Sequence, residues 1–366
     1  MTGCEKDKVL YMKKVSVIVP CYNATEYIER CMRYLLGQTI GIENMEIILV
    51  DDASTDEGKT FQMLLEYEAK YPDTIIVISL EQNMRQGGAR NAGISYAGGE
   101  YLMFCDVDDW LVPDAMERLY RIAKDTDADV VEFQNREVTD NTIETEIFSE
   151  DEKRSQIYEF GEEEEKRQFI MASSENCALG CWTKFYRMSI IQDNRIRFAE
   201  HLICEEPSFT LPVRFYEKRH VLTNEIFYCY YQSPDSTIRS SWDERKFDNM
   251  EVWMILIEDL RQRGFLEPYH KELECMFFEW GFGMSIRMLV ARGYMLTKEE
   301  LNLFKENTLQ LFPEVLHNPY VITKDEGWNL LMKGLLEMEL TDENVPELNH
   351  LMKYFLQRYQ ELCNEV

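Results

Sequence analysis

Three aspartates lie within four positions directly after an apolar, β-prone segment. Residues 101–105 read Tyr-Leu-Met-Phe-Cys, and Asp106, Asp108 and Asp109 follow. Like charges this close repel, so in a cleft of reduced dielectric at least one carboxyl pKa would rise unless a divalent cation lay among them. Oxygen ligands after a buried strand are typical of a Mg²⁺ or Mn²⁺ site shared with phosphate oxygens of a substrate. The alternative is an acidic turn that leads into the next helix, and this short motif alone does not decide between the two.

The elements that would position these aspartates alternate regularly along the first part of the chain. Apolar or β-branched runs, separated by amphipathic helical patterns, cover residues 15–19, 46–50, 74–80, 101–105 and 128–133. We expect Pro20 to end the first strand. Strands that alternate with helices in this way predict an α/β fold with a doubly wound, mostly parallel mixed sheet.

Polar loops directly follow three of these predicted strands, at residues 20–23, 51–52 and 106–109. In open α/β sheets, ligands bind outside the carboxyl ends of the strands, near the point where the strand order reverses. We therefore expect the three loops to form one binding site. The chain lacks a Gly-x-Gly-x-x-Gly motif after the first strand and a complete Gly-x-x-x-x-Gly-Lys-Ser/Thr phosphate loop, which argues against a dinucleotide or P-loop site.

The character of the chain changes beyond about Trp242, where long helical patterns replace the strands. These patterns cover residues 250–263, 270–292, 298–311, 324–339 and 345–363. They predict a separate all-helical region. A Met-rich and aromatic stripe within it, from Met276 to Met288, is typical of core or partner-facing packing rather than of a cofactor site. Residues 137–167 are polar and acidic, as in a solvated loop that leads into a helix.

Composition limits the class of protein and its partners. The chain has 366 residues, 45% of them apolar, which suffices for two or three packed domains. A net charge of −28 argues against an extended nucleic-acid surface. Ten cysteines without paired spacing are typical of free thiols, and Cys177 and Cys181 lack the partners of a zinc set. No apolar run is long enough to span a membrane, and residues 1–14 lack the apolar centre of a signal peptide, so we expect a cytoplasmic protein.

Four motifs together closely resemble the family-two glycosyltransferases. They are VSVIVPCYN at 15–23, ILVDDASTD at 48–56, ARNAG at 89–93 and FCDVDD at 104–109, in the family's order and spacing. The resemblance implies the GT-A fold, a nucleotide-diphosphate sugar donor, a Mn²⁺ or Mg²⁺ cofactor and inversion at the anomeric carbon. It covers about residues 15–238, and the helical region lies outside it. Together with the change of pattern near Trp242, the resemblance predicts an N-terminal extension at 1–14, a catalytic domain at 15–240 and a helical domain at 241–366.

Matching this chain to the family's motifs implies specific roles for its residues. Nucleotide-binding residues on this basis are Pro20, Tyr22, Asn23, Asp52, Arg90 and Asp106, and metal ligands are Asp108 and Asp106. In the family, an aromatic side chain of the first loop can stack on the base, the acid at Asp52 accepts a hydrogen bond from it, and the arginine lies near the diphosphate. Ala53 stands where the family commonly has Gly, which suggests a loop without positive φ there. Gln232 stands where relatives often carry a basic residue.

An inverting transfer also needs a general base on the opposite face of the sugar. The family places it in a Glu/Asp-Asp pair about a hundred residues after the metal motif, and Glu205-Glu206 match that position. We assign Glu206 as the base, with Glu200 and Glu205 as alternatives. Either acid of the pair could instead be a helix N-terminal charge favoured by the dipole. Trp182 and His201 are candidates for an acceptor pocket or for ordinary packing.

The resemblance implies an inverting, metal-dependent transfer from a UDP-sugar to a hydroxyl of a glycan or lipid-linked glycan in bacterial capsule, exopolysaccharide or teichoic-type polymer synthesis. Association with the inner face of the membrane and a homodimer fit this setting. One alternative is a sugar nucleotidyltransferase. That class has a first loop rich in Gly and Arg, and residues 20–24 contain neither. Another is a non-catalytic glycan-binding or scaffolding subunit, although such a subunit would not need several costly carboxylates in one cleft.

Overall fold

The computed structural model describes residues 12–139, 155–176, 179–232, 244–324 and 327–364. The chain divides into two compact units. The first comprises Met1–Gly161, Gly180–His201 and Tyr216–Arg239, and the second comprises Glu162–Leu179, Leu202–Phe215 and Ser240–Val366. Each unit has a hydrophobic core of its own.

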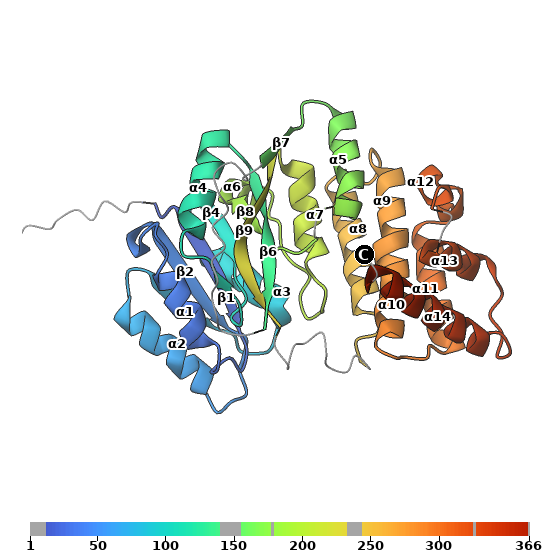
Figure 1. Ribbon diagram of the computed structural model, residues 1–366, viewed down its shortest axis with the longest axis horizontal. Coiled ribbons are helices and arrows are strands. Elements are labelled where there is room, and N and C mark those ends of the chain that lie inside the picture. Colours follow the sequence, from blue (N-terminus) through green and yellow to red (C-terminus); the bar gives the residue numbers. More distant parts are fainter. Residues whose placement is uncertain (1–11, 140–154, 177–178, 233–243, 325–326, 365–366) are drawn as a thin grey trace, which may run out of the picture. The chain divides into compact units, whose positions relative to one another are not determined.

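The first unit is built on one mixed sheet (Figure 1). Its strands are β1 (Val15–Cys21), β2 (Met45–Asp51), β3 (Ile75–Ser79), β4 (Tyr101–Phe104), β5 (Trp110–Leu111), β6 (Val130–Val138), β7 (Ser155–Glu159), β8 (Lys184–Arg187) and β9 (Arg219–Tyr231). In the described residues their order is β3-β2-β1-β4-β8-β6-β9-β5, with β7 paired to β9. The first four strands are parallel, whereas β8 is antiparallel to both of its neighbours. The strand order reverses between β1 and β4, so the predicted switch point lies there.

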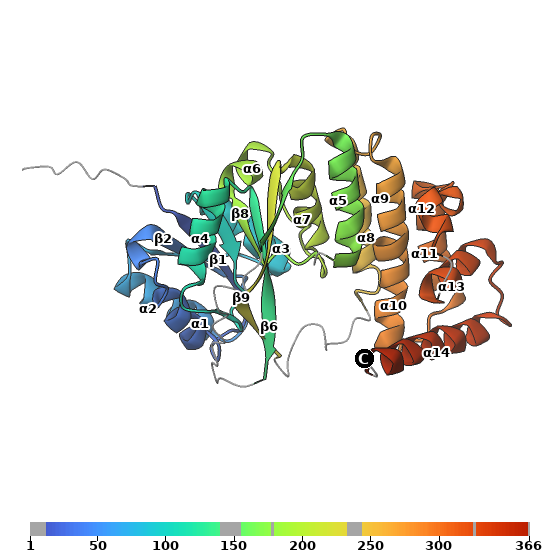
Figure 2. The same cartoon turned by 45° about the horizontal axis from the view of Figure 1, so that its top comes forward.

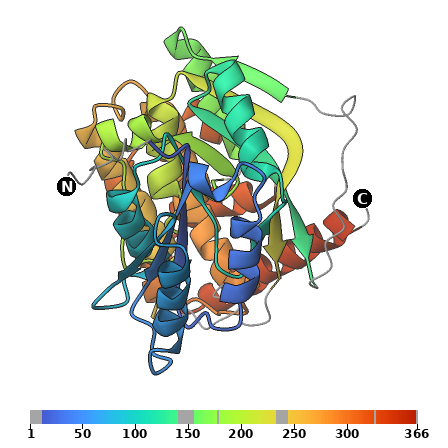
Figure 3. The same cartoon turned by 90° about the vertical axis from the view of Figure 1, so that its left-hand side faces the viewer.

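Helices cover both faces of this sheet (Figure 3). On the face of Val15 and Val17, buried side chains pack with those of α1 (Ile28–Leu36), α2 (Lys59–Lys70) and α4 (Ala115–Thr126). On the other face lies α3 (Arg85–Tyr96), where a Cβ on Gly93 would come within 2.5 Å of Ile18 Cγ2. A glycine is therefore needed for α3 to approach β1 this closely. The α/β, doubly wound prediction is confirmed.

The first strand does not end at Pro20, as expected from the sequence. β1 continues to Cys21, and Pro20 lies opposite Val50 in the parallel ladder with β2. Ile18, two residues earlier, accepts a hydrogen bond from Cys105, so Pro20 turns its nitrogen to the same side of the strand, beyond the last residue paired with β4. The missing N–H of proline therefore costs the sheet no ladder bond.

The second unit is helical throughout its described residues. Its helices are α5 (Glu163–Asn176), α7 (Pro207–Tyr216, whose last residue belongs to the first unit), α8 (Asp248–Gln262), α9 (His270–Met276), α10 (Met284–Ala291), α11 (Lys298–Leu311), α12 (Pro319–Ile322), α13 (Gly327–Glu337) and α14 (Val345–Asn364). Helix α5 runs beside α9, and α14 crosses α10 (Figures 1 and 2). A π-helical turn, Phe277–Gly283, joins α9 to α10.

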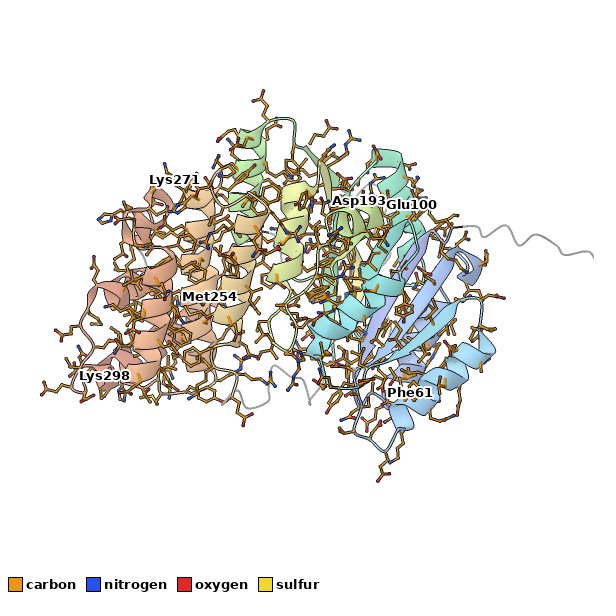
Figure 4. The ribbon with its side chains drawn as sticks, turned by 180° about the vertical axis from the view of Figure 1, so that it is seen from behind. Phe61, Glu100, Asp193, Met254, Lys271 and Lys298 are labelled. Carbon is orange, nitrogen blue, oxygen red and sulfur yellow. The ribbon has the colours of Figure 1, made fainter. Side chains whose placement is uncertain are left out.

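The core of the second unit explains why it includes two segments from before residue 240. Ile170 of α5 and Leu211 of α7 are fully buried in the same cluster as Trp253 of α8. Met254 of α8 packs against this cluster among the helices (Figure 4). The predicted boundary at residue 240 separates α5 and α7 from α8, whereas their apolar faces share one core. Met276 and Phe277 of the Met-rich stripe are buried there, which confirms their packing role. Among the described residues, no helix is long and apolar enough to cross a bilayer.

Candidate active site

The loop after β1 is tied to the loop after β2 by Asn23. The Asn23 amide N–H donates to Ser54 Oγ at 2.9 Å, its side-chain oxygen accepts from Thr55 N at 2.8 Å, and its Nδ2 donates to Thr55 Oγ1 at 3.2 Å. Asn23 has a φ of 50°, a conformation that asparagine tolerates better than most residues. Beside it, the Tyr22 side chain is exposed. Asn23 therefore acts on the geometry of two loops, while Tyr22 presents a ring to solvent.

Asp52 lies at the carboxyl end of β2 and is almost fully buried. Its Oδ1 accepts a hydrogen bond from Met84 N at 2.6 Å, and its own amide donates to Cys21 O at 2.8 Å. Burial raises the pKa of Asp52 to about 6, although the Met84 amide and the Arg85 guanidinium act in the opposite direction. Asp52 is therefore an acceptor whose charge state changes just below neutral pH.

Two non-glycine residues around Asp52 have left-handed backbone conformations. Ala53 has a φ of 55°, so the expectation that this loop lacks positive φ is wrong. Arg85, the first residue of α3, has a φ of 63°. Such conformations cost of order 1 kcal/mol for a residue with a side chain and concentrate at functional sites.

Arg90 of α3 is completely buried and pairs with Asp106. Its Nη2 lies 2.8 Å from Asp106 Oδ1, and the guanidinium carbon is 5.5 Å from the Phe198 ring centroid and 5.9 Å from that of Phe104. The fully buried guanidinium therefore serves first to orient the carboxylate of Asp106. Its place near the diphosphate stays a prediction.

The three aspartates after β4 have different environments. Asp109 is buried, and its two carboxylate oxygens accept from Tyr228 Oη at 2.7 Å and Tyr231 N at 2.7 Å. The Tyr228 hydroxyl in turn accepts from Asp106 N at 3.0 Å. Asp109 is thus occupied in holding the loop, whereas Asp106 and Asp108 are partly exposed.

Asp106 and Asp108 are the two side chains of this loop that remain available to a cation. Burial, and then the nearby charge of Asp106, raises the pKa of Asp108 to about 6, and Arg30 acts against this rise. Among the described residues, no three His, Cys, Asp or Glu side chains are grouped as they would be in an all-protein metal site. Two carboxylates suit a Mg²⁺ or Mn²⁺ ion that takes its other ligands from a diphosphate and water.

Glu205 and Glu206 precede α7 in the second unit and differ in exposure. Glu205 is buried, whereas Glu206 is partly exposed. The Glu206 carbonyl accepts from Phe209 N at 3.1 Å and Thr210 N at 2.9 Å, so the hydrogen bonding of the helix begins at this residue. Pro207 occupies the first helical position, where its lack of an N–H costs nothing. A carboxylate at this position is favoured in its ionised form by the helix dipole.

The other candidates lie in the first unit. Glu200 Oε1 accepts from Asn91 Nδ2 at 2.9 Å, and His201 N donates to Met84 O at 3.0 Å, so this segment is attached to α3 and to the residue that binds Asp52. Trp182 stacks on Tyr230 with ring centroids 5.5 Å apart. Gln232 Nε2 donates to Glu137 Oε2 at 2.5 Å.

Two structural roles at this site were missed from the sequence. Tyr228 is separated from Asp106 by 122 positions, and no local pattern marks it as its partner. Arg30, on α1, donates to Asp108 O at 2.5 Å. The third aspartate of the motif, Asp109, could have drawn attention to such partners. An aspartate that does not bind the cation needs another hydrogen-bond partner.

Comparison with known proteins identifies the family. The model of glycosyl transferase family 2 matches residues 16–188. The putative glycosyltransferase EpsH of Bacillus subtilis is 30% identical over 292 residues, which cover 75% of this chain and 79% of EpsH. The chain belongs to glycosyl transferase family 2. This confirms the resemblance seen in the four sequence motifs.

Further similarities of this family 2 glycosyltransferase concern poly(ribitol-phosphate) transferases. A poly(ribitol-phosphate) beta-glucosyltransferase of Bacillus spizizenii is 26% identical over 218 residues, 59% of this chain, but the match spans only 32% of that relative's length. The crystal structure of Staphylococcus aureus TarS 1-349 in complex with UDP-GlcNAc superposes with a TM-score of 0.64 at 20% identity, covering 94% of this chain and 92% of that one. This likeness confirms the GT-A fold for the glycosyltransferase.

Proposed function

We propose that this glycosyltransferase moves a sugar from a UDP-sugar to a hydroxyl of a bacterial surface polysaccharide, of the exopolysaccharide or teichoic type, with a divalent cation and with inversion. The observation that carries the proposal is the arrangement of acids at the β1–β4 switch point. Asp52 follows β2, and Asp106 and Asp108 follow β4, on the two sides of β1. The name of the poly(ribitol-phosphate) transferase supports a teichoic-type acceptor.

The first unit holds the donor in this proposal. Ionised Asp52 accepts the imide N–H of uracil, and the exposed Tyr22 ring stacks on the base. Asn23 and Pro20 maintain the shape of that loop. Arg90 orients Asp106 for the ribose and the cation.

Asp106 and Asp108 would hold the Mn²⁺ or Mg²⁺ ion. The cation supplies Lewis-acid stabilisation of the negative charge that develops on the departing UDP. Asp109 takes no direct part, because both of its oxygens are used within the protein.

Glu206 accepts the proton of the attacking hydroxyl in this proposal. Of the two adjacent acids, Glu206 is the more exposed, and it directly precedes α7, where the helix dipole favours a negative charge. A base removed from the cation is required because an inverting displacement brings the nucleophile in opposite the leaving group.

Calorimetry and a hydrolysis screen test the donor part of the proposal. UDP should bind in Mn²⁺ and much more weakly in EDTA, and Asp108→Ala in Mn²⁺ should resemble the wild type in EDTA. A screen of nucleotide sugars for hydrolysis, with and without Mn²⁺, should then identify the donor. Equal UDP affinity in all three conditions would refute the metal assignment.

A further inference from the structure

Arg30 packs against the aromatic rings of Trp110 and Tyr231, beside the proposed metal-binding loop. Its guanidinium carbon is 4.5 Å from the Trp110 ring centroid and 4.3 Å from that of Tyr231. The Trp110 ring also stacks on Tyr34, with centroids 5.9 Å apart. The Trp110 and Tyr231 rings also contact each other, with centroids 6.3 Å apart and planes tilted by 39°, so the guanidinium packs against both rings on one side and its charge is attracted to each.

Packed against these two rings, Arg30 reaches the main chain of Asp108. Its Nη2 donates to the Asp108 carbonyl oxygen at 2.5 Å. This bond engages the backbone and leaves the Asp108 carboxylate outside it. A guanidinium that formed a bidentate pair with that carboxylate would compete directly with a cation.

The loop is therefore held near both of its cation ligands. The Tyr228 hydroxyl holds the Asp106 amide, and Arg30 holds the Asp108 carbonyl. Tyr231 adds a third attachment, because its amide donates to Asp109. Its ring also packs against Arg30. A fixed positive charge here also offsets the mutual repulsion of the three aspartates before any cation arrives.

We propose that Arg30 is a positioning residue for the divalent cation: packed against Trp110 and Tyr231, it holds Asp108 ready to coordinate the ion. This inference rests on the proposed assignment of Asp108 as a metal ligand. Residues that orient metal ligands without touching the metal typically change affinity by about 10- to 100-fold when they are removed.

The test uses three variants of the full chain. Arg30→Met keeps an apolar side chain against the rings but removes the charge and the donor, and Arg30→Lys keeps the charge without the planar group. Arg33→Met is the matched control, since Arg33 is exposed on the same helix and lies 6.0 Å from the Tyr34 ring centroid. Electron paramagnetic resonance measures the Mn²⁺ dissociation constant with UDP present, and calorimetry measures UDP affinity in EDTA.

Arg30→Met should weaken Mn²⁺ binding by about 10- to 100-fold, Arg30→Lys by less, and Arg33→Met by less than twofold. UDP affinity in EDTA should stay within twofold in all three. In an Asp108→Ala background, Arg30→Met should cause no further loss of Mn²⁺ affinity. The inference is overturned if Arg30→Met binds Mn²⁺ like the wild type, or if it weakens UDP binding in EDTA by the same factor, which would indicate a general collapse of the loop. A wild-type protein that does not bind Mn²⁺ would instead refute the proposed function itself.

Discussion

Tyr228→Phe removes one hydroxyl that bridges two groups of the loop after β4. In the native structure this buried hydroxyl accepts from Asp106 N at 3.0 Å and donates to Asp109 Oδ2 at 2.7 Å. The substitution keeps the ring and its contact with Trp182, whose centroid is 4.9 Å away. The change therefore isolates the two hydrogen bonds.

The expected loss of stability follows from these two bonds. A buried group left without its partner costs about 1–3 kcal/mol, and a charged group costs more. Asp109 keeps its bond from Tyr231 N, which limits its share of the cost. We expect a total of about 3–5 kcal/mol, which corresponds to a fall in melting temperature of about 6 °C or more for a unit of this size.

Thermal and urea unfolding, followed by circular dichroism, measure this loss. Tyr230→Phe is the matched control, because Tyr230 lies two residues further along β9 and stacks on the same Trp182. It should cost less than about 1 kcal/mol, as most substitutions away from buried networks do. Should Tyr228→Phe unfold within 1 kcal/mol of the control, the loop does not depend on this hydroxyl and the role given to Asp109 is wrong.

Three further predictions concern catalysis, donor binding and the second unit. Glu206→Gln should lower the rate of sugar transfer by about a hundredfold or more while UDP affinity stays within a few fold, because a general base acts only on the chemical step. Near-normal transfer in this variant, together with loss of transfer in Glu205→Gln or Glu200→Gln, would assign the base to one of those residues. Affinity for UDP-glucose in saturating Mn²⁺ should fall as the pH drops through about 6, because the buried Asp52 carboxylate, with its pKa raised to about 6, becomes protonated and accepts hydrogen bonds less well. Asp52→Asn should bind UDP-glucose more weakly and flatten this pH dependence, and an unchanged profile would exclude Asp52 as the titrating group. A chain ending at Ser240 should aggregate in size-exclusion chromatography, since it would expose Ile170, Leu211 and Phe215, which pack into the core that later helices complete. A monomeric, fully active product would show that this core is dispensable.

The order and type of the elements, and the acids that end β2 and β4, could be predicted from the sequence. Hydrophobic periodicity is a local property, so strands such as β1 and helices such as α11 follow from it within a few residues. The positions of Asp52, Asp106 and Asp108 at the switch point follow from the alternation of strands and helices, because the carboxyl ends of parallel strands meet at one edge of a sheet.

Backbone conformation and strand ends were less predictable. Ala53 adopts a left-handed conformation that its residue type disfavours, because tertiary contacts at the site outweigh a local preference of about 1 kcal/mol. Pro20 stays inside β1 because its nitrogen faces the side on which β4 pairing has ended, and that depends on where a different strand stops.

The sequence by itself determined the family, the layered fold and the acids that make the chemistry of a sugar transfer available. Only the tertiary structure decided how those acids divide their work. Asp109 accepts from Tyr228 and is buried, whereas Asp106 and Asp108 are partly exposed, and Arg30 of α1 donates to the Asp108 carbonyl. The three aspartates are nearly equivalent in the sequence. They differ in the folded protein because burial and hydrogen bonding depend on partners far along the chain, 78 positions away for Arg30 and Asp108 and 119 for Tyr228 and Asp109.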